Sequence, residues 1–433
     1  MHGMTGFRFV HAADLHLDTP FQGIAAPAPA VAEALRDASL QAWENLVDLT
    51  LDQQAAFLLL AGDTYDGAER GIRAQLRFAR GLERLGRQGV RVFIVDGNHD
   101  PQAQGWSAVR VWPSNVTVFG HERVAVAAVD REGRRLADVY GISYERRDVT
   151  ENLALRFPRA AEAPAEPGVL RVGLLHCNVG ANADHLPYSP CSVADLSAAA
   201  VDYWALGHVH KRQVLHASQP AAAYPGNLQG RSAKPSETGA KGALVVEVND
   251  GVVGNISFHA CDAARFEVLS VDITDCPDLP MLAERLLDAS AGLQAEASGR
   301  HLVVRAILSG RGPVHAHLRR PDVVGALLDD LRERSAGTEP LLWWESLRDT
   351  TRSPLDRAQI RGRGDFSAEL LRQSEELAAD PQALEATFAG LAAQLPQRRL
   401  PASLRQLAPA ERLQVLADAE SLALDLLSRE DEP

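Results

Sequence analysis

The sequence predicts a layered α/β protein, and three observations support this fold class. Short apolar runs have the length and composition of buried strands, at residues 7–12, 57–61, 90–95, 172–175 and 203–206. Stretches with helical periodicity alternate with these runs, as at 31–54 and 71–87. Polar residues follow each run directly. We therefore expect chemically active side chains to collect along one edge of a sheet.

The polar clusters contain the residue types that bind divalent metal ions. They are Asp14-Leu15-His16, Gly62-Asp63, Gly97-Asn98-His99-Asp100, Leu175-His176 and Gly207-His208-Val209-His210. Two ions roughly 3.5–4 Å apart need a bridging carboxylate, a role open to Asp63, together with further nitrogen and oxygen ligands. A mixture of Asp, Asn and His favours a first-row transition metal over calcium, and we expect Mn²⁺.

The spacing within the clusters supports shared metal binding but leaves the assignment open. Asp14 and His16 are two residues apart, so in an extended segment both side chains leave the same face, and His208 and His210 repeat this geometry. The spacing does not say which histidine serves which ion. A single Asp-x-His or Gly-Asp is usually a turn or a cap, so the prediction depends on all the clusters following strands in order.

The order and spacing of these clusters resemble the calcineurin-like metallophosphoesterases, and within them the DNA repair nucleases of the SbcD type. Residues 11–18, His-Ala-Ala-Asp-Leu-His-Leu-Asp, and 224–231, Tyr-Pro-Gly-Asn-Leu-Gln-Gly-Arg, are similar to the subgroup called YhaO-like. The resemblance extends from about residue 7 to residue 242. It implies a sandwich of two mixed sheets flanked by helices.

The resemblance also implies a role for each residue of the clusters. One metal would be held by Asp14, His16, Asp63 and His210. The other would be held by Asp63, Asn98, His176 and His208. His99 would assist departure of the leaving oxygen, Asp100 would hold its ring, and a metal-activated water would attack the phosphodiester.

One segment, Gly62-Asp63-Thr64-Tyr65-Asp66, departs from the nuclease pattern, in which many members have a histidine at the position of Asp66. Protein phosphatases of the superfamily have an aspartate there followed by arginine, but Gly67 follows here. The Gly-Asn-His-Asp motif, in place of Gly-Asn-His-Glu, also argues against a phosphoprotein phosphatase. Asp66 is a candidate for supporting a ligand rather than binding metal.

Composition agrees with an intracellular enzyme of more than one domain. The chain has 433 residues and 46% hydrophobic residues, enough for sizeable cores. The four cysteines, Cys177, Cys191, Cys261 and Cys276, form no CxxC motif, which argues against a disulfide framework or a zinc ribbon. We see neither a signal peptide nor an apolar stretch long enough to span a membrane, and expect a cytoplasmic protein.

A net charge of −13 is unusual for a nucleic-acid enzyme, because DNA binding normally depends on Lys and Arg. Two bound divalent cations would add about four positive charges at the scissile phosphate. Among basic residues we favour Lys211, Arg212 and Arg231 as substrate contacts because they flank the site. His185 and Tyr188, in an irregular segment after His176, are further candidates, although a surface turn explains them equally well. For Trp106 and Trp112, core packing is favoured over stacking on a base.

We expect three segments: a nuclease domain at 1–262, a small α+β module at 263–350, and a helical region at 351–433. The resemblance implies that the second segment caps the nuclease and helps to position DNA. In the second segment, strands are expected at 266–273, 301–308 and 340–347, with helices at 279–293 and 321–335. His315 and His317 lack accompanying carboxylates and are interpreted as surface residues. Leucines with helical spacing fill the third segment, which proline divides into short helices. The resemblance implies that this region docks a coiled-coil ATPase.

The sequence therefore predicts a dimetal DNA nuclease that acts on single strands or ends with an SMC-like ATPase partner, and homodimerisation is implied by the resemblance alone. No nucleotide-binding loop is recognisable, so ATP dependence would come from the partner. One alternative is a small-molecule phosphodiesterase or phosphomonoesterase that uses the same site. Another is a DNA-end binding scaffold with a vestigial site, which the complete ligand set disfavours.

Overall fold

The computed structural model describes residues 6–19, 29–67, 71–103, 111–159, 165–180, 188–354, 356–394 and 407–428. The chain forms two compact units. The first comprises Met1–Leu269, Leu287–Ala306 and Leu328–Ser346. The second comprises Ser270–Leu286, Ile307–Leu327 and Leu347–Pro433. The three segments expected from the sequence stay a prediction.

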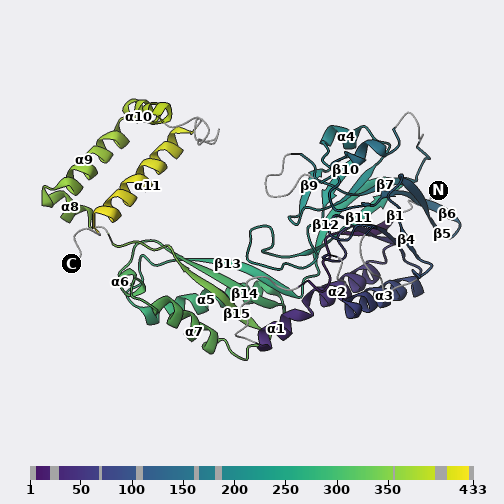
Figure 1. Ribbon diagram of the computed structural model, residues 1–433, viewed down its shortest axis with the longest axis horizontal. Coiled ribbons are helices and arrows are strands. Elements are labelled where there is room, and N and C mark those ends of the chain that lie inside the picture. The colour runs from purple at the N-terminus through teal and green to yellow at the C-terminus, as the bar shows by residue number, and fades with distance from the viewer. Residues whose placement is uncertain are drawn as a thin grey trace. The chain divides into compact units, whose positions relative to one another are not determined.

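The first unit contains two six-stranded mixed sheets (Figure 1). The first sheet has the order β12-β11-β1-β2-β3-β4. Its strands are β1 (Gly6–Ala12), β2 (Phe57–Ala61), β3 (Arg91–Val95), β4 (Val116–Val118), β11 (Gly242–Asn249) and β12 (Val252–Ala260). Strands β1 to β4 are parallel, and β11 runs antiparallel to β1. The carboxyl ends of β1, β2 and β3 therefore meet at one edge.

The second sheet has the order β5-β6-β7-β8-β10-β9. Its strands are β5 (Ala125–Arg131), β6 (Arg134–Ile142), β7 (Leu170–His176), β8 (Tyr203–Gly207), β9 (Gln213–His216) and β10 (Ala221–Tyr224). Strands β6, β7, β8 and β10 are parallel to their neighbours in that run. The two sheets confirm the predicted sandwich.

Strand residues alternate between the space between the sheets and the outer faces. Phe57 and Leu59 of β2 pack in the inner core with residues of the second sheet, such as Leu174 and Tyr203. The intervening Leu58 packs in a separate core on the outer face. Both faces of β2 are buried, which explains why its sequence is uniformly apolar rather than alternating.

Helices cover the outer faces of the sheets. On the first sheet, α2 (Ala38–Asp52) and α3 (Ile72–Arg87) pack side by side (Figure 1), with Trp43 and Phe78 ring centroids 4.7 Å apart. On the second sheet, the 3₁₀ turn η1 (Leu153–Arg156) and α4 (Val193–Ser197) pack over Trp204. The indole of Trp204 donates to the Leu196 carbonyl at 3.0 Å.

The helix expected at 31–54 is two helices, α1 (Pro29–Arg36) and α2. The helical character of this stretch is confirmed, and it divides into two helices because the two halves pack on different surfaces. Val31 and Leu35 of α1 pack against Phe266 and Val303 of a third sheet, whereas α2 packs on the first sheet. Asp37, between them, leaves helical geometry and forms an ion pair with Arg73.

The third sheet has the order β13-β14-β15, and its elements agree in type with those expected after residue 263. Its strands are β13 (Ala264–Asp272), β14 (His301–Ser309) and β15 (Leu342–Asp349), and the accompanying helices are α5 (Leu279–Ala297), α6 (His315–Leu318) and α7 (Val323–Arg334). His315 and His317 lie in α6, where His315 Nδ1 is 2.8 Å from Thr351 Oγ1. His315 is therefore a partly buried structural residue rather than a free surface one.

The C-terminal region is helical, as expected. Its helices are α8 (Arg357–Arg363), α9 (Phe366–Ala379), α10 (Pro381–Gln394) and α11 (Pro409–Ser428). Pro381 and Pro409 begin α10 and α11, positions that proline tolerates because its missing N–H has no helical partner. None of the helices in the described ranges is both long and apolar enough to cross a membrane.

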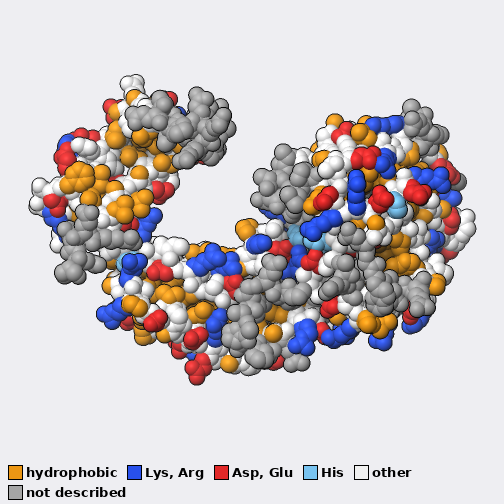
Figure 2. All heavy atoms as spheres, viewed as in Figure 1, with side chains coloured by type: hydrophobic (Ala, Val, Ile, Leu, Met, Phe, Trp, Pro, Cys, Tyr) orange, Lys and Arg blue, Asp and Glu red, His pale blue; other side chains and the backbone are white. Residues whose placement is uncertain are grey.

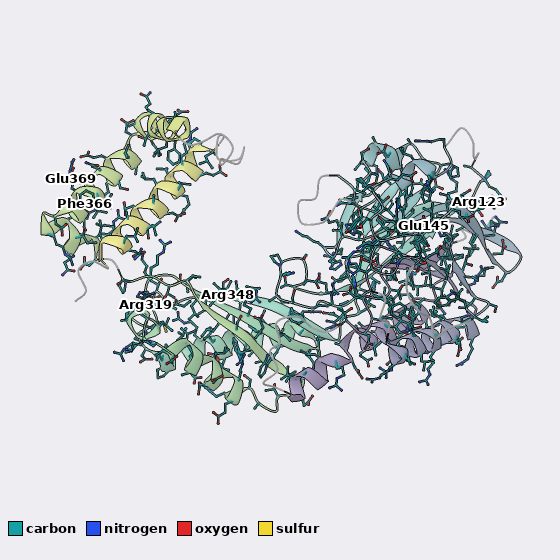
Figure 3. The ribbon with its side chains drawn as sticks, viewed as in Figure 1. Arg123, Glu145, Arg319, Arg348, Phe366 and Glu369 are labelled. Atoms are coloured by element: carbon teal, nitrogen blue, oxygen red, sulfur yellow. The ribbon has the colours of Figure 1, made fainter. Side chains whose placement is uncertain are left out.

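The C-terminal helices expose much of their apolar surface. Hydrophobic side chains gather along α9, α10 and α11 in Figure 2. Phe366, at the start of α9, is 69% exposed (Figure 3), and Leu426 of α11 is 55% exposed. Contiguous exposed apolar residues of this kind are typical of surfaces that bind another protein.

Candidate metal centre

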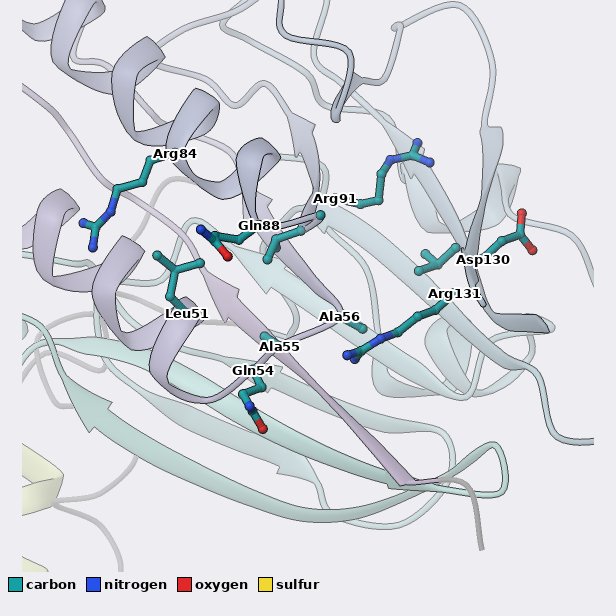
Figure 4. Close-up of a pocket in the computed structure, with 12 residues that line it drawn as sticks. Leu51, Gln54, Ala55, Ala56, Arg84, Gln88, Arg91, Asp130 and Arg131 are labelled. Carbon is teal, nitrogen blue, oxygen red and sulfur yellow. The ribbon is translucent and has the colours of Figure 1, made fainter. Parts of the chain in front are cut away.

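The polar clusters predicted from the sequence meet at the carboxyl-terminal edge of the two sheets. Asp14, Asp63 and Asn98 follow β1, β2 and β3 of the first sheet, while His176 ends β7 and His208 follows β8 of the second. A pocket of about 540 Å³ lies at the opposite edge, next to Ala56 and Val90, which precede β2 and β3 (Figure 4). The candidate site is therefore distinct from this pocket.

Asp14, His16 and His210 form one group of candidate ligands, with one ligand atom from each within 4.8 Å of the others. The Nε2 atoms of His16 and His210 are 3.2 Å apart, and His210 Nε2 is 4.0 Å from Asp14 Oδ1. Asp14 is fully buried, and both of its carboxylate oxygens accept from the backbone N–H of His208. Asp14 thus also connects β1 to the histidine cluster after β8.

Asp63, Asn98, His176 and His208 form the second group. Oδ1 of Asn98 is 3.0 Å from Nε2 of His176 and 3.2 Å from Nδ1 of His208. Oδ2 of Asp63 is 3.4 Å from the same Nε2 of His176, and Asp63 and Asp14 share a group with His176. Asp63 therefore lies next to both groups, as a bridging carboxylate would.

The donor set fits divalent cations because several acceptor atoms face one another. Nδ1 of His176 donates to the Ala61 carbonyl at 2.8 Å, which in the neutral ring leaves Nε2 as an acceptor facing the oxygens of Asn98 and Asp63. His16 Nδ1 is buried without a hydrogen-bond partner among the described residues. A cation between Nε2 of His176 and the oxygens of Asn98 and Asp63 would satisfy these three atoms, and the mixture of imidazole, amide and carboxylate suits first-row transition metals.

Backbone conformation is strained at the candidate ligands. Asp14, His16, Asp63 and His208 have φ angles of 51°, 44°, 52° and 101°. Side chains other than glycine rarely adopt positive φ, and such strain gathers at functional sites. Glycines provide the space: a Cβ on Gly207 would lie 1.8 Å from the carbonyl oxygen of Ala61.

The ring of His99 is held by Asp66 and not by Asp100. Nδ1 of His99 is 2.5 Å from Oδ1 of Asp66. The carboxylate of Asp100 instead accepts from the backbone N–H groups of Thr64, at 2.7 Å, and Gly97, at 2.8 Å. The expectation that Asp100 orients His99 is corrected: the buried Asp100 joins the loops after β2 and β3, and the nearby Asp66 reaches the ring.

The charges of the site shift its pKa values strongly. Burial alone would lower the pKa of His176, but the charge of Asp63 and their hydrogen bond raise it to about 9. Burial raises the pKa of Asp14 to about 6. Burial, followed by the charge of Arg231, lowers the pKa of His16. The carboxylates of Asp63 and Asp14 around His176 favour positive charge at this position.

Glu237 is a site residue that sequence reasoning missed. Its Oε1 is 2.6 Å from Nδ1 of His210 and its side chain is buried. Burial would raise the pKa of Glu237, but the hydrogen bond and charge of His210 lower it to about 2. Glu237 lies 27 residues after His210 in an irregular segment, so no periodicity or motif spacing connects the two.

The expected substrate contacts differ in their surroundings. Lys211 is exposed next to His210. Arg212 lies over the Phe258 ring, with its guanidinium carbon 4.3 Å from the centroid. Arg231 is mostly buried and donates to Asp66 Oδ2 at 3.1 Å. The roles of all three as substrate contacts stay predictions.

The irregular segment after His176 is described only in part. His185 lies outside the described residues, as does Trp106. The ring centroid of Tyr188 is 5.7 Å from that of His208, so Tyr188 packs against a candidate ligand. Trp112 meets Phe78 edge-on, with ring centroids 6.3 Å apart, but its side chain is 37% exposed, so it does not lie in the core as expected.

Comparisons with known proteins agree with this geometry. The family model for calcineurin-like phosphoesterases matches residues 7–212, and the model for the middle domain of the metallophosphoesterase YhaO matches residues 266–352. The uncharacterized metallophosphoesterase YhaO of Bacillus subtilis is 35% identical over 348 residues, which cover 80% of this chain and 83% of that protein.

Two more distant relatives are named as a DNA repair protein and as a nuclease subunit. The DNA double-strand break repair protein Mre11 of Archaeoglobus fulgidus is 26% identical over 233 residues, or 51% of this chain and 50% of that protein. One subunit of the nuclease SbcCD from Bacillus subtilis is 21% identical over 272 residues, or 56% of this chain and 67% of that protein.

Proposed function

The chain belongs to the calcineurin-like metallophosphoesterases, which hydrolyse phosphoesters at a site of two metal ions, and from this premise we propose that it is a DNA nuclease. The observation that carries the proposal is the convergence of His16, His176, His208 and His210 with Asp14, Asp63 and Asn98 at one edge of the sandwich, with His99 beside them. A two-metal site with a separate proton donor beside it can hydrolyse a phosphodiester.

In the proposed site, one ion would be held by Asp14, His16, Asp63 and His210, and the other by Asp63, Asn98, His176 and His208. Bound ions supply an activated water as nucleophile and withdraw charge from the phosphate. Mn²⁺ is the proposed metal because imidazole and carboxylate occur together in both ligand sets.

His99 acts in this proposal as the donor to the leaving oxygen. Its Nδ1 is engaged by Asp66, which fixes the tautomer and leaves Nε2 for the substrate. Burial alone would lower the pKa of His99, but its hydrogen bond to Asp66 and the charge of Asp63 raise it. A raised pKa favours the protonated ring, the state that a general acid needs.

DNA is the proposed substrate because the chain is similar to relatives named as a DNA double-strand break repair protein and as a nuclease subunit. The exposed residues Lys211 and Arg212 directly follow His210 and would contact the phosphate backbone. The exposed apolar residues of α9 and α11 would dock a coiled-coil ATPase. That partner would supply DNA affinity, since a chain of net charge −13 is expected to bind DNA weakly on its own. A homodimer is a further arrangement that the proposal allows.

The test is a time course on end-labelled single-stranded and double-stranded DNA with Mn²⁺, Mg²⁺ or chelator, run with wild type, His99→Ala and the control His216→Ala. His216 is an exposed histidine of β9. We expect metal-dependent shortening that His99→Ala loses while it still binds Mn²⁺. Cleavage of a small diester with intact DNA, even with the ATPase present, would favour the small-molecule phosphodiesterase instead.

A further inference from the structure

The segment between β10 and β11, residues 225–241, encloses His210. The backbone N–H of Asn227 donates to the His210 carbonyl at 3.3 Å, and Lys241 Nζ donates to the same carbonyl at 3.1 Å. A Cβ on Gly226, whose φ is 82°, would lie 2.8 Å from that oxygen. The segment thus packs directly on the backbone of a candidate ligand.

Glu237 connects this segment to the His210 ring, and its two oxygens have different partners. Oε2 accepts from Asn227 Nδ2 at 2.9 Å and from the Arg231 backbone N–H at 3.0 Å, which fixes the carboxylate within the segment. Oε1 is 2.6 Å from His210 Nδ1. The side chain is 7% exposed, so little water competes for these contacts.

A carboxylate accepts hydrogen bonds but does not donate them, so Nδ1 of His210 must carry the proton of this contact. In the neutral ring, Nε2 then has a lone pair, and it points toward His16 Nε2 at 3.2 Å and Asp14 Oδ1 at 4.0 Å. Glu237 thereby determines both the tautomer and the direction of the imidazole.

We propose that Glu237 is a positioning residue that presents Nε2 of His210 to a divalent cation bound with Asp14 and His16. The inference rests on the proposed metal-dependent function. A purely structural role would need only Oε2, whose bonds to Asn227 and Arg231 lie within the segment. The separate bond from Oε1 to a candidate ligand is what a structural role does not explain.

The test is Glu237→Gln, which keeps the shape of the side chain and can keep an oxygen toward Asn227 and Arg231. It then presents an amide N–H₂ to His210 Nδ1, which forces that nitrogen to accept and moves the ring proton to Nε2. Mn²⁺ binding to substrate-free protein is measured by calorimetric titration. We expect one of two ions to bind about 10–100-fold more weakly and the other to bind as in wild type.

The matched control is Glu247→Gln, which removes a partly exposed carboxylate that pairs with Arg8 on β11 and β1. It should bind both ions as wild type does. A double-mutant cycle gives the second readout: in a His210→Ala background, Glu237→Gln should cause no further loss of affinity, because Glu237 acts through the ring. Independent, additive losses would indicate a structural role and overturn the inference.

The inference would also be overturned if Glu237→Gln bound both ions with the same affinity as wild type. If this variant does not fold, Glu237→Asp replaces it, since it keeps the charge but shortens the reach to His210; the same loss at one site is expected, and unchanged binding contradicts it. Wild-type protein that binds no divalent cation would instead contradict the proposed function itself.

Discussion

Asp66 and His99 form a contact of 2.5 Å between Oδ1 and Nδ1, and the second oxygen of Asp66 accepts from Arg231 at 3.1 Å. The hydrogen bond to His99 is the largest cause of the lowered pKa of Asp66, so the carboxylate stays charged across the neutral range. A charged acceptor at Nδ1 keeps that nitrogen protonated and favours the imidazolium form of His99.

Replacing Asp66 should therefore reduce catalysis without removing the metals. For Asp66→Asn we expect kcat on a small diester to fall about 10–100-fold, with Mn²⁺ binding unchanged, because the ring loses its charged partner. Steady-state kinetics with saturating Mn²⁺ provide the measurement, and Asp48→Asn, at a surface pair with Arg84, is the control. Full activity of Asp66→Asn would show that His99 needs no carboxylate.

The exposed Lys211 and the enclosed Arg231 should respond differently to substitution. Lys211→Ala should weaken DNA binding modestly and reduce the slope of log K against log salt by about 0.7–0.9, the value for one phosphate contact. Arg231→Gln should mainly lower kcat, because Arg231 supports Asp66. Filter binding at several salt concentrations and steady-state kinetics test the two variants, with Arg134→Ala on the exposed β5–β6 hairpin as control. An unchanged salt slope for Lys211→Ala would remove this residue from the DNA surface.

The metal-free protein should lose stability as pH rises above neutrality. His176 has its pKa raised from 6.5 to about 9, so its contribution is fully present below pH 6.5 and is lost as pH rises toward 9. Between pH 6.5 and 8 this one group gives a fall of about 2 kcal/mol in the free energy of unfolding. This pH range ends at 8 because burial lowers the pKa of Lys241 to about 8. Above that pH, the loss of the Lys241 proton in the folded state makes stability increase with pH, which opposes the effect of His176.

Urea unfolding in chelator at several pH values measures this effect. His176→Gln should show a flatter profile over the same window, since the glutamine does not titrate. A wild-type stability that is constant or increases from pH 6.5 to 8 would contradict the prediction.

A methyl group at Gly207 should disturb the site through the backbone. The Cβ of Gly207→Ala would lie 1.8 Å from the Ala61 carbonyl oxygen and 2.9 Å from His176 Nδ1, so a strand end must shift. We expect a loss of about 1–3 kcal/mol in stability and weaker Mn²⁺ binding. Gly325→Ala, in α7 where a Cβ meets nothing within 4 Å, should be neutral or stabilising by up to about 1 kcal/mol. Calorimetric melting measures the stability of both variants, and metal titration measures their Mn²⁺ affinity. Equal stability and equal Mn²⁺ affinity in Gly207→Ala and Gly325→Ala would exclude the steric explanation.

Much of the fold follows from sequence patterns that act locally. Residues 57–61 are uniformly apolar because both faces of β2 are covered, and this pattern is visible without a structure. The helix break at Asp37 was not predictable in the same way. It depends on the positions of two packing surfaces, near Phe266 and near Leu58, that lie far away along the chain.

The candidate site shows the same division. Asp63 and Asn98 could be proposed from sequence because each directly follows a strand and belongs to a recognisable motif. The pairing of His99 with Asp66 could not be predicted from the sequence. Asp100 is adjacent to His99, whereas Asp66 is 33 residues away and reaches the ring only when the loops fold. Glu237 likewise becomes a neighbour of His210 only when the segment before β11 folds back.

The candidate ligands come from both sheets, with Asp14, Asp63 and Asn98 after strands of the first and His176 and His208 at strand ends of the second. Relative sliding of the sheets would change every ligand separation that crosses between them. In the inner core, Phe9 and Phe57 stack at 4.8 Å and Phe9 meets Tyr203 edge-on at 5.1 Å, and these contacts help to hold the two sheets in register. Substitutions at these rings, although they touch no ligand, should alter which size of ion the protein selects.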